Sequence, residues 1–227
     1  MKKIIGHQDI ARRFENSIRQ NRLASTFLFV GPEGVGKKTF ALEFAKSLLC
    51  ETHPNHELNS CGNCEGCQLF DAGNHPDFHF VQKSKNKAFL QIEQFIGDRD
   101  HRNRKGLCHD LFLSPFRGGH KIAVIDDTDF FNQESANCLL KLLEEPPDHS
   151  ILVMIGTSEH KQLDTIRSRS QVIHFQPLSE ANVLKILESL DTSTASLSAR
   201  EIASLSEGSL NVIHQILEEG LLEFRDR

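Results

Sequence analysis

Apolar runs alternate with amphipathic stretches along most of the chain. Five of these runs predict strands, at residues 27–30, 75–81, 121–125, 151–155 and 172–175. Between the runs, apolar residues recur every three or four positions, which is the spacing of helices that bury one face. Buried strands that alternate with helices are typical of a parallel sheet covered on both faces. The pattern therefore predicts an α/β fold with a five-stranded parallel sheet.

The helices of this part follow from the same spacing. The first covers residues 4–22, where apolar side chains repeat every four positions between charged ones. Another begins near residue 92, and a longer one covers residues 133–145. Pro146 and the proline after it cannot continue that helix, so it ends there.

Helical spacing continues after the last predicted strand, but no further apolar run follows. Three more helices are predicted, at residues 179–190, 198–206 and 209–219. They are long enough for a small bundle, and Pro177 marks the boundary before them. We expect two domains, an α/β domain over residues 1–177 and a helical domain over residues 178–227.

A glycine-rich turn joins the first predicted strand to the helix after it. Residues 31–39 read GPEGVGKKT, and the apolar residues of 40–49 keep helical spacing. Strand, glycine-rich turn and helix are the context of a phosphate-binding loop, although a chance turn is the alternative. Glycines let successive N–H groups point at an anion, and the helix N-terminus adds its positive dipole. The candidate nucleotide-binding residues of this turn are Gly31, Gly34, Val35, Gly36, Lys37, Lys38 and Thr39.

The two lysines of this turn differ in what they can contribute to nucleotide binding. Lys37 is placed to reach the outer phosphates of a nucleotide. The next position normally carries Ser or Thr, whose hydroxyl ligates Mg²⁺. Here it is Lys38, which has no oxygen to offer a metal. Thr39 is rotated by about 100° from that position on the helix, so we do not expect it to compensate.

Acidic residues follow the third predicted strand. A buried strand that ends in carboxylates is what a magnesium site beside a phosphate loop requires. Asp126 stands where the metal-coordinating carboxylate belongs, and Asp127 stands where a longer glutamate usually activates water. The alternative is that Asp127 and Asp129 only cap the helix that follows. Thr157, after the fourth strand, is a candidate contact for the γ-phosphate.

Four of the six cysteines are spaced like metal ligands. Cys50, Cys61, Cys64 and Cys67 follow the pattern C-x10-C-x2-C-x2-C. Four thiolates without an open position describe a structural Zn²⁺ site within residues 50–70. The alternatives are an iron–sulfur centre, or a histidine in place of one cysteine. The histidines near enough in the sequence are His53, His56 and His75.

Composition narrows the class of protein. The chain has 227 residues, 38% of them hydrophobic, and a net charge of −5. Residues 178–227 carry nine acidic and four basic side chains, which accounts for this entire excess. A protein that binds duplex DNA alone usually shows a strongly basic face instead. With no signal peptide and no apolar run of about 18 residues, we expect a cytoplasmic protein with no membrane partner.

Three features together resemble one protein family. They are residues 137–147 (NCLLKLLEEPP), the four cysteines after the phosphate-loop helix, and Ser168, Arg169 and Ser170. Together they are similar to the clamp loader of bacterial DNA polymerase III, over essentially the whole chain. The resemblance implies an AAA+ domain with an inserted zinc module, then a helical lid. The family's third, collar domain is expected to be absent from this chain.

The departures from the family pattern favour one subunit type. The ATPase subunits, gamma and tau, carry a Lys-Ser/Thr pair, an Asp-Glu pair and a lid arginine. This sequence has Lys38, Asp127 and Asn211 at these three places. It keeps Arg169, which in the delta-prime subunit is an arginine finger supplied in trans to a neighbouring ATP site. The resemblance thus implies a delta-prime-like subunit with bound ATP or ADP possible, little or no hydrolysis of its own, and poor support for Mg²⁺.

The implied partners follow from this resemblance. They are the gamma/tau and delta clamp-loader subunits, with the sliding clamp and primer-template DNA contacted through the assembled complex. Two alternatives stay open: a divergent gamma/tau-type ATPase in which Thr39 and Asp127 suffice, and an AAA+ zinc protein with no role in replication.

Overall fold

The fold is built on a parallel sheet. The computed structural model describes residues 4–52, 58–189 and 199–219. The strands are β1 (Thr26–Val30), β2 (Phe78–Val81), β3 (Lys121–Ile125), β4 (Ser150–Ile155) and β5 (Gln171–His174). Their order is β2-β3-β4-β1-β5, and every neighbouring pair is parallel. The predicted α/β class and the five parallel strands are confirmed.

One face of the sheet is covered by α1 (Gln8–Arg19) and α2 (Lys37–Leu48), with α3 (Glu65–Asp71) beside them. Phenylalanines dominate the core between these helices and the sheet. The ring of Phe14 lies 4.8 Å from that of Phe44 and 4.9 Å from that of Phe27, centroid to centroid. The Phe14–Phe44 pair is edge-to-face and the Phe14–Phe27 pair is tilted. Aromatic pairs in favourable geometry add about 0.5–1.5 kcal/mol each beyond the area they bury. The cluster fixes α1 against the strand that leads into the phosphate loop.

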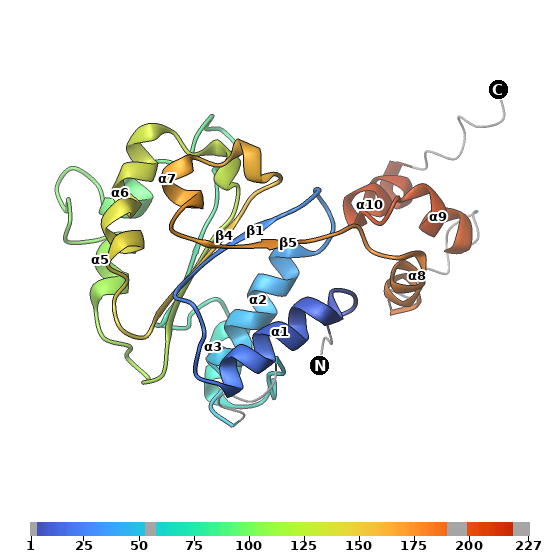
Figure 1. Cartoon of the computed structure of the whole chain (residues 1–227), viewed down its shortest axis with the longest axis horizontal. Helices are drawn as coiled ribbons and strands as arrows, with labels where there is room; N and C mark the ends of the chain where they lie inside the picture. The colour runs from blue at the N-terminus through green and yellow to red at the C-terminus, as the bar shows by residue number, and fades with distance from the viewer. Residues whose placement is uncertain (1–3, 53–57, 190–198, 220–227) are drawn as a thin grey trace.

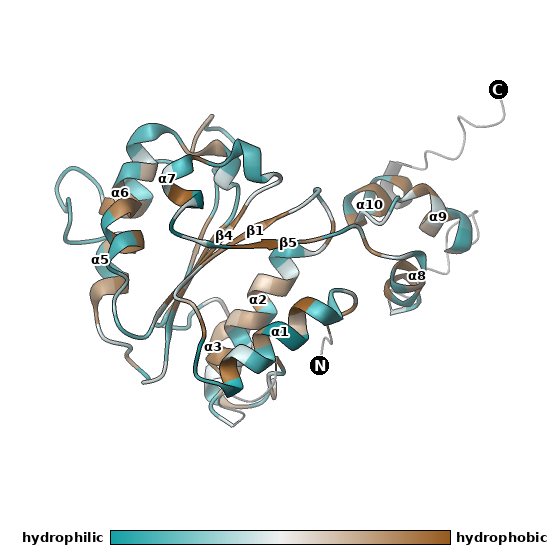
Figure 2. Cartoon of the chain, viewed as in Figure 1, coloured by the Kyte–Doolittle hydropathy of each residue, from teal (hydrophilic) through white to brown (hydrophobic). Residues whose placement is uncertain are grey.

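The other face is covered by α4 (Glu93–Ile96), α5 (Leu107–Phe112), α6 (Gln133–Glu144) and α7 (Asp164–Arg167). Its core is mainly aliphatic, and α6 contributes Ala136, Leu139 and Leu142 to it. Colouring by hydropathy shows the strands as the apolar centre between two helical layers (Figure 2). Two short 3-10 turns, η1 (Thr128–Phe130) and η2 (Glu159–Lys161), follow β3 and β4.

Two predicted helices differ from those observed. The first begins at Gln8 rather than at residue 4, because Gly6 (φ 86°) and His7 (φ 56°) are left-handed. The helix predicted from residue 92 spans only Glu93–Ile96, because Gly97 has φ 81° and residues 98–105 form turns. A helix cannot pass through a left-handed residue, so local backbone geometry decided both ends.

Three helices follow the sheet: α8 (Glu180–Ser189), α9 (Ala199–Leu205) and α10 (Leu210–Glu219). They share a core of their own that includes Leu178, Val183 and Ile213. Residues 190 and 198, the expected end and start of two of these helices, lie outside the described residues. A separate core from residue 178 onward is compatible with the predicted division at Pro177, which stays a prediction. In Figure 1 this bundle stands at the end of the sheet where β1 leads into the phosphate loop.

Within the described part of the chain, no helix combines the length and the apolar character needed to cross a membrane.

Candidate functional site

The phosphate loop, Asp126 and Thr157 meet at one edge of the sheet. The loop follows β1, Asp126 follows β3, and Gly156 and Thr157 follow β4. Carboxyl ends of parallel strands share an edge, and ligands of open α/β sheets bind there. The pairing of β1 with β4 fixes this meeting, since the Gly156 N–H donates to the Phe29 carbonyl at 2.9 Å.

Lys37 is held above its own loop. Its side chain is buried, and Nζ donates to the carbonyl oxygens of Gly31 and Pro32 at 2.6 Å each. Burial lowers the pKa of Lys37, and the carboxylates of Asp126 and Asp129 partly oppose this shift. An ammonium group has three protons to donate, so one remains for another acceptor at the loop.

Lys38 points to the end of β3. Its Nζ lies 3.2 Å from Asp126 Oδ2 and 3.0 Å from Gln82 Oε1, and 4.5 Å from the centre of the Phe80 ring. The second carboxylate oxygen of Asp126 accepts the Asp127 N–H at 3.0 Å. Both oxygens that could face a magnesium ion are therefore engaged, and a fixed positive charge stands beside them. The residues present do not fit a magnesium ion here.

Thr39 and Val35 do not complete such a site. Thr39 is exposed on α2, whereas Val35 is buried and its carbonyl lies 2.7 Å from His7 Nε2. The Val35 carbonyl thus links the loop to the residue before α1.

Asp127 does not cap α6. It has φ 61° and precedes η1, while Asn132 caps α6 by accepting the Ser135 N–H at 2.8 Å. The alternative in which Asp127 or Asp129 caps that helix is wrong, because the cap residue Asn132 stands five positions after Asp127 and three after Asp129. Burial, and next the neighbouring carboxylate of Asp126, raises the pKa of Asp127.

Asp129 instead organises the residues after β4. Its carboxylate accepts the Thr157 N–H at 2.9 Å and also accepts a hydrogen bond from the Gln162 side chain. Thr157 Oγ1 is buried and has no hydrogen-bond partner in the described part of the chain. A hydroxyl at this place can donate a hydrogen bond to a group at the carboxyl ends of the strands, or accept one from it. The sequence offers one signal for Asp129: it is the third carboxylate after the strand.

The first turn of α10 contacts the phosphate loop. The Leu210 N–H donates to the Gly34 carbonyl at 2.8 Å, and Ser209 Oγ donates to the Glu33 carbonyl at 3.0 Å. Gly34 has φ 75°, and a Cβ there would lie 2.3 Å from Ser209 Oγ, so only glycine fits. Asn211, the residue at the expected position of a lid arginine, is exposed just beyond this contact.

Arg169 lies at the opposite edge of the sheet from this chain's own phosphate loop. It follows α7 and precedes β5, whereas the loop follows β1, and β1 and β5 are parallel. Four strand residues separate the two edges by about 13 Å. The Arg169 side chain makes two contacts. Its Nη2 pairs with Glu144 Oε1 at 2.8 Å, and its Nη1 donates to the Thr165 carbonyl at 3.2 Å. Arg169 therefore cannot serve the phosphate loop of its own chain.

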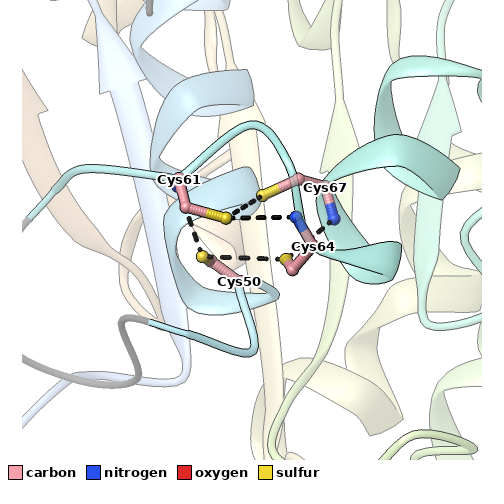
Figure 3. Close-up of side chains that lie close together, drawn as sticks. All are labelled: Cys50, Cys61, Cys64 and Cys67. Atoms are coloured by element: carbon pink, nitrogen blue, oxygen red, sulfur yellow. Dashed lines mark hydrogen bonds between the residues drawn. The ribbon is translucent and has the colours of Figure 1, made fainter.

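The four cysteines converge on one point (Figure 3). Their Sγ atoms all lie within 4.8 Å of one another, with 3.9 Å for Cys50–Cys64 and for Cys61–Cys67. A tetrahedral zinc with Zn–S bonds of about 2.3 Å places its sulfurs about 3.8 Å apart. The four residues thus fit one tetrahedral metal ion.

Local structure brings the cysteines together. Cys50 follows α2, Cys64 is the N-cap of α3, and Cys67 lies in the first turn of α3. Hydrogen bonds from the Thr52 hydroxyl and the N–H groups of Asn63 and Cys64 lower the pKa of Cys61 to about 5, whereas burial raises the pKa of Cys67.

Of the three histidines considered as alternative metal ligands, the structure describes one. His53 and His56 lie outside the described residues. His75 is buried, and its Nδ1 accepts the Asp77 N–H at 3.1 Å.

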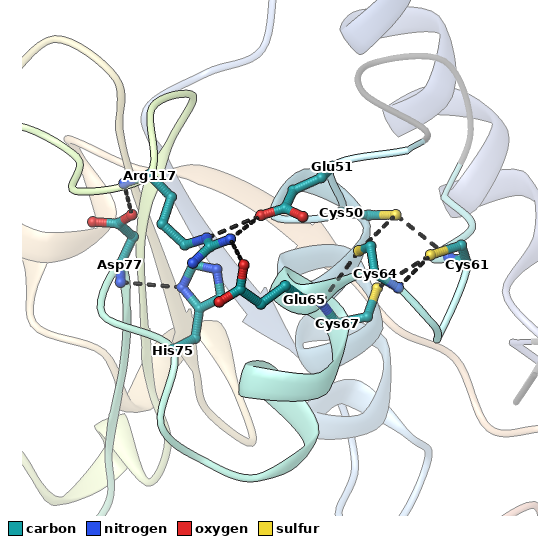
Figure 4. A network of polar contacts seen from close by, with 9 residues as sticks. All are labelled: Cys50, Glu51, Cys61, Cys64, Glu65, Cys67, His75, Asp77 and Arg117. Carbon is teal, nitrogen blue, oxygen red and sulfur yellow. Dashed lines mark hydrogen bonds and ion pairs between the residues drawn. The ribbon is translucent and has the colours of Figure 1, made fainter.

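An arginine ties the cysteine module to the sheet (Figure 4). Arg117 Nη2 contacts Glu51 Oε1 at 2.5 Å and Glu65 Oε2 at 2.6 Å, and each glutamate directly follows a cysteine of the module. The N–H groups of Phe116 and Arg117 donate to the fully buried carboxylate of Asp77 at 2.7 and 2.9 Å. The sequence gives no signal for Arg117 or Asp77, because 39 and 40 positions separate the hydrogen-bonded residues.

Comparison with known proteins identifies the family to which this chain belongs. The sequence profile described as "DNA polymerase III, delta subunit" matches residues 6–179. The chain is 36% identical to the delta' subunit of DNA polymerase III from Bacillus subtilis over 166 residues, which is 72% of this chain and 45% of that protein. It is 28% identical to the tau subunit from the same organism over 222 residues, covering 96% of this chain and 37% of that protein.

The chain is also 29% identical to the delta' subunit from Pseudomonas aeruginosa over 203 residues, which is 58% of that protein. The chain thus spans about two fifths to three fifths of the length of these three relatives.

Solved structures support the same fold. A DNA polymerase III gamma-subunit-related protein from Thermotoga maritima superposes with a TM-score of 0.52 at 18% identity, over 92% of this chain and 61% of that one. The RuvB Holliday-junction branch-migration motor of the same organism gives 0.53 at 14% identity, over 96% and 63%.

Proposed function

This chain belongs to the DNA polymerase III delta-subunit family, whose members are AAA+ clamp-loader subunits of bacteria, and from this premise we propose that it acts as a delta-prime-like subunit. In this role it helps to load the sliding clamp onto primed DNA. It works with the gamma/tau and delta subunits and contacts clamp and primer-template DNA through the assembled complex. The homologues carry both delta' and tau names, so the choice between subunit types rests on the site.

The observation that carries the proposal is the pairing of Lys38 with Asp126 at 3.2 Å. Hydrolysis by a phosphate-loop ATPase requires a hydroxyl and a carboxylate that hold magnesium. Here an ammonium replaces the hydroxyl and occupies the carboxylate. Asp127 is also one methylene shorter than the glutamate that usually activates water, and catalytic contacts tolerate such a shortfall poorly. We therefore expect little or no ATP hydrolysis by this chain, although the loop is suited to hold ATP or ADP.

Arg169 gives the chain a role in a neighbour's site. Its position supports action in trans, because it stands about 13 Å from the edge that carries its own loop. A guanidinium supplied by a neighbour stabilises the charge that develops on the γ-phosphoryl group and is worth about 10³–10⁵ in rate in well-studied cases. Arg169 is therefore proposed as the arginine finger for an adjacent ATP-binding subunit.

The cysteine module is proposed to hold a structural Zn²⁺. Four thiolates and no open position are typical of structural sites, and the sulfur separations suit the metal. The same proposal keeps two domains, residues 1–177 and 178–227, with the helical part acting as the lid of the phosphate loop.

The test compares ATP turnover by the chain alone and in a reconstituted complex. We expect no magnesium-dependent turnover by the isolated chain. In a complex with gamma and delta subunits, Arg169→Ala is expected to lower the rate while the complex still assembles. An unchanged rate in that complex would remove the role of Arg169.

The second candidate is a divergent gamma/tau-type ATPase, which the similarity to tau over 96% of the chain favours. Brisk magnesium-dependent turnover by the isolated chain, abolished in Lys37→Ala, would establish it. Membership of the family argues against an AAA+ zinc protein with no role in replication.

A further inference from the structure

The Lys38 side chain is fixed by three groups from the neighbouring strands. Asp126 Oδ2 lies 3.2 Å from Nζ, Gln82 Oε1 lies 3.0 Å away, and the ring of Phe80 lies beneath the ammonium at 4.5 Å. A cation between a carboxylate and an aromatic face gains from both charge and ring quadrupole. Lys38 therefore has a defined position at the end of β3, although its side chain is 45% exposed.

The loop beside it keeps its anion-binding donors. In the described part of the chain, the backbone N–H groups of residues 34–39 donate to no acceptor outside α2. The first N–H groups of a helix lack intrahelical acceptors, and together with a glycine-rich turn they form a phosphate cradle. Among the described residues, Lys37 Nζ has one proton left after its two hydrogen bonds, and the buried Thr157 hydroxyl oxygen has no hydrogen-bond partner.

The position that a divalent cation would take is already occupied. Lys37 and Lys38 put two ammonium groups at the loop, and the Asp126 carboxylate that a metal would use is paired with Lys38 at 3.2 Å. A divalent cation would have to displace Lys38 from Asp126 and also take the oxygen that the Asp127 N–H occupies.

From this geometry we propose that the phosphate loop binds the polyphosphate of a nucleoside triphosphate without magnesium, with the Lys38 ammonium in place of the metal. The inference shares the Lys38–Asp126 pair with the proposed subunit role and adds to that role the metal-free form of the bound nucleotide. Nucleotide binding by the isolated chain neither requires partners nor reports on them, so either idea can fail alone.

The test is an equilibrium titration of the chain with a fluorescent ATP analogue, in magnesium and in EDTA. For the wild-type chain we expect affinities that agree within about threefold in the two buffers. Lys38→Thr introduces the hydroxyl that magnesium sites use and removes the ammonium. We expect it to lose at least about tenfold in affinity in EDTA and to regain part of that loss in magnesium.

Two further variants serve as controls. Lys38→Arg keeps a cation at the same place and is expected to bind in EDTA within a few fold of the wild-type chain. Lys185→Ser removes one positive charge from the exposed face of α8, so its expected affinity is unchanged in both buffers. Circular dichroism verifies that each variant is folded. If Lys38→Thr does not fold, the titrations of the wild-type chain and of Lys38→Arg in the two buffers still test whether binding needs magnesium.

Three outcomes would overturn the proposal: wild-type binding that disappears in EDTA, Lys38→Thr binding in EDTA as tightly as wild type, or no saturable binding in either buffer.

Discussion

The guanidinium of Arg169 pairs with the carboxylate of Glu144, with 2.8 Å between Nη2 and Oε1. Glu144 is the last residue of α6, and Arg169 follows α7 by two residues. Both side chains are partly exposed, so the pair is worth about 0–1 kcal/mol in stability. If Arg169 acts on a phosphate of another chain, as proposed above, it has to release this carboxylate. In the proposed role of Arg169, Glu144 would therefore be its partner in the resting state.

The first prediction concerns this pair. In a reconstituted complex, Arg169→Ala should lower ATP turnover at the adjacent site by at least about tenfold, because the charge supplied in trans is lost. Glu144→Gln removes only the resting partner, so turnover should stay at the wild-type rate or rise. The free energy of unfolding of each variant should lie within about 1 kcal/mol of the wild-type value. If Glu144→Gln loses as much activity as Arg169→Ala, Glu144 orients the arginine instead.

The second prediction concerns the metal. Cys64→Ser should abolish zinc binding, because three thiolates hold the ion more weakly and Cys64 also forms the N-cap of α3. Metal analysis should find about one zinc per wild-type chain and much less in the variant. The sheet should remain, as judged by circular dichroism, because the strands have their own core. Cys138→Ser is the matched control, since Cys138 lies outside the cysteine cluster. One zinc per chain in Cys64→Ser would contradict the assignment.

The third prediction concerns Arg117. Arg117→Gln removes the ion pairs that fix Glu51 and Glu65 beside the cysteines. Zinc should then pass to a colorimetric chelator faster than from the wild-type chain, although the amount bound at the start should be equal. High salt should accelerate release from the wild-type chain and affect the variant less, because screening weakens ion pairs. Equal release rates at low salt would show that the module holds its metal without this arginine.

The fourth prediction concerns pH. Burial lowers the pKa of His79 and of His120 below the ordinary value of 6.5. As the pH falls through 6.5, the unfolded chain takes up protons before the folded chain does, so the free energy of unfolding decreases toward the lowered pKa values. Denaturant midpoints should be constant above that pH and fall below it. His79→Gln, which does not titrate, should show a shallower decline. A midpoint that rises on acidification would reverse the sign of this linkage.

The fifth prediction concerns the phenylalanine core. Phe14 is 3% exposed and packs on Phe27 and Phe44, so Phe14→Ala should cost about 3–5 kcal/mol of unfolding free energy. Phe116→Ala removes the same atoms from a side chain that is 81% exposed and should change stability by less than about 0.5 kcal/mol. Urea titration measures both. Similar losses in the two variants would mean that Phe14 is not a core residue of the folded chain.

The sequence by itself determined the fold class, the five strands, the phosphate loop and the four-cysteine group. These features are local: an apolar run, a glycine spacing or a C-x2-C step carries its meaning within a few residues. The sequence did not determine the helix ends at Gln8 and Ile96. The left-handed residues that limit these helices leave no trace in the pattern of apolar positions.

Only the tertiary structure decided which side chains meet. Lys38 reaches Asp126 because α2 lies beside the ends of β2 and β3, and Arg169 is separated from its own loop because β5 runs parallel to β1. Asp77 accepts N–H groups 39 and 40 positions away. Such contacts depend on strand order and register, which follow from packing of the whole core and not from any local pattern.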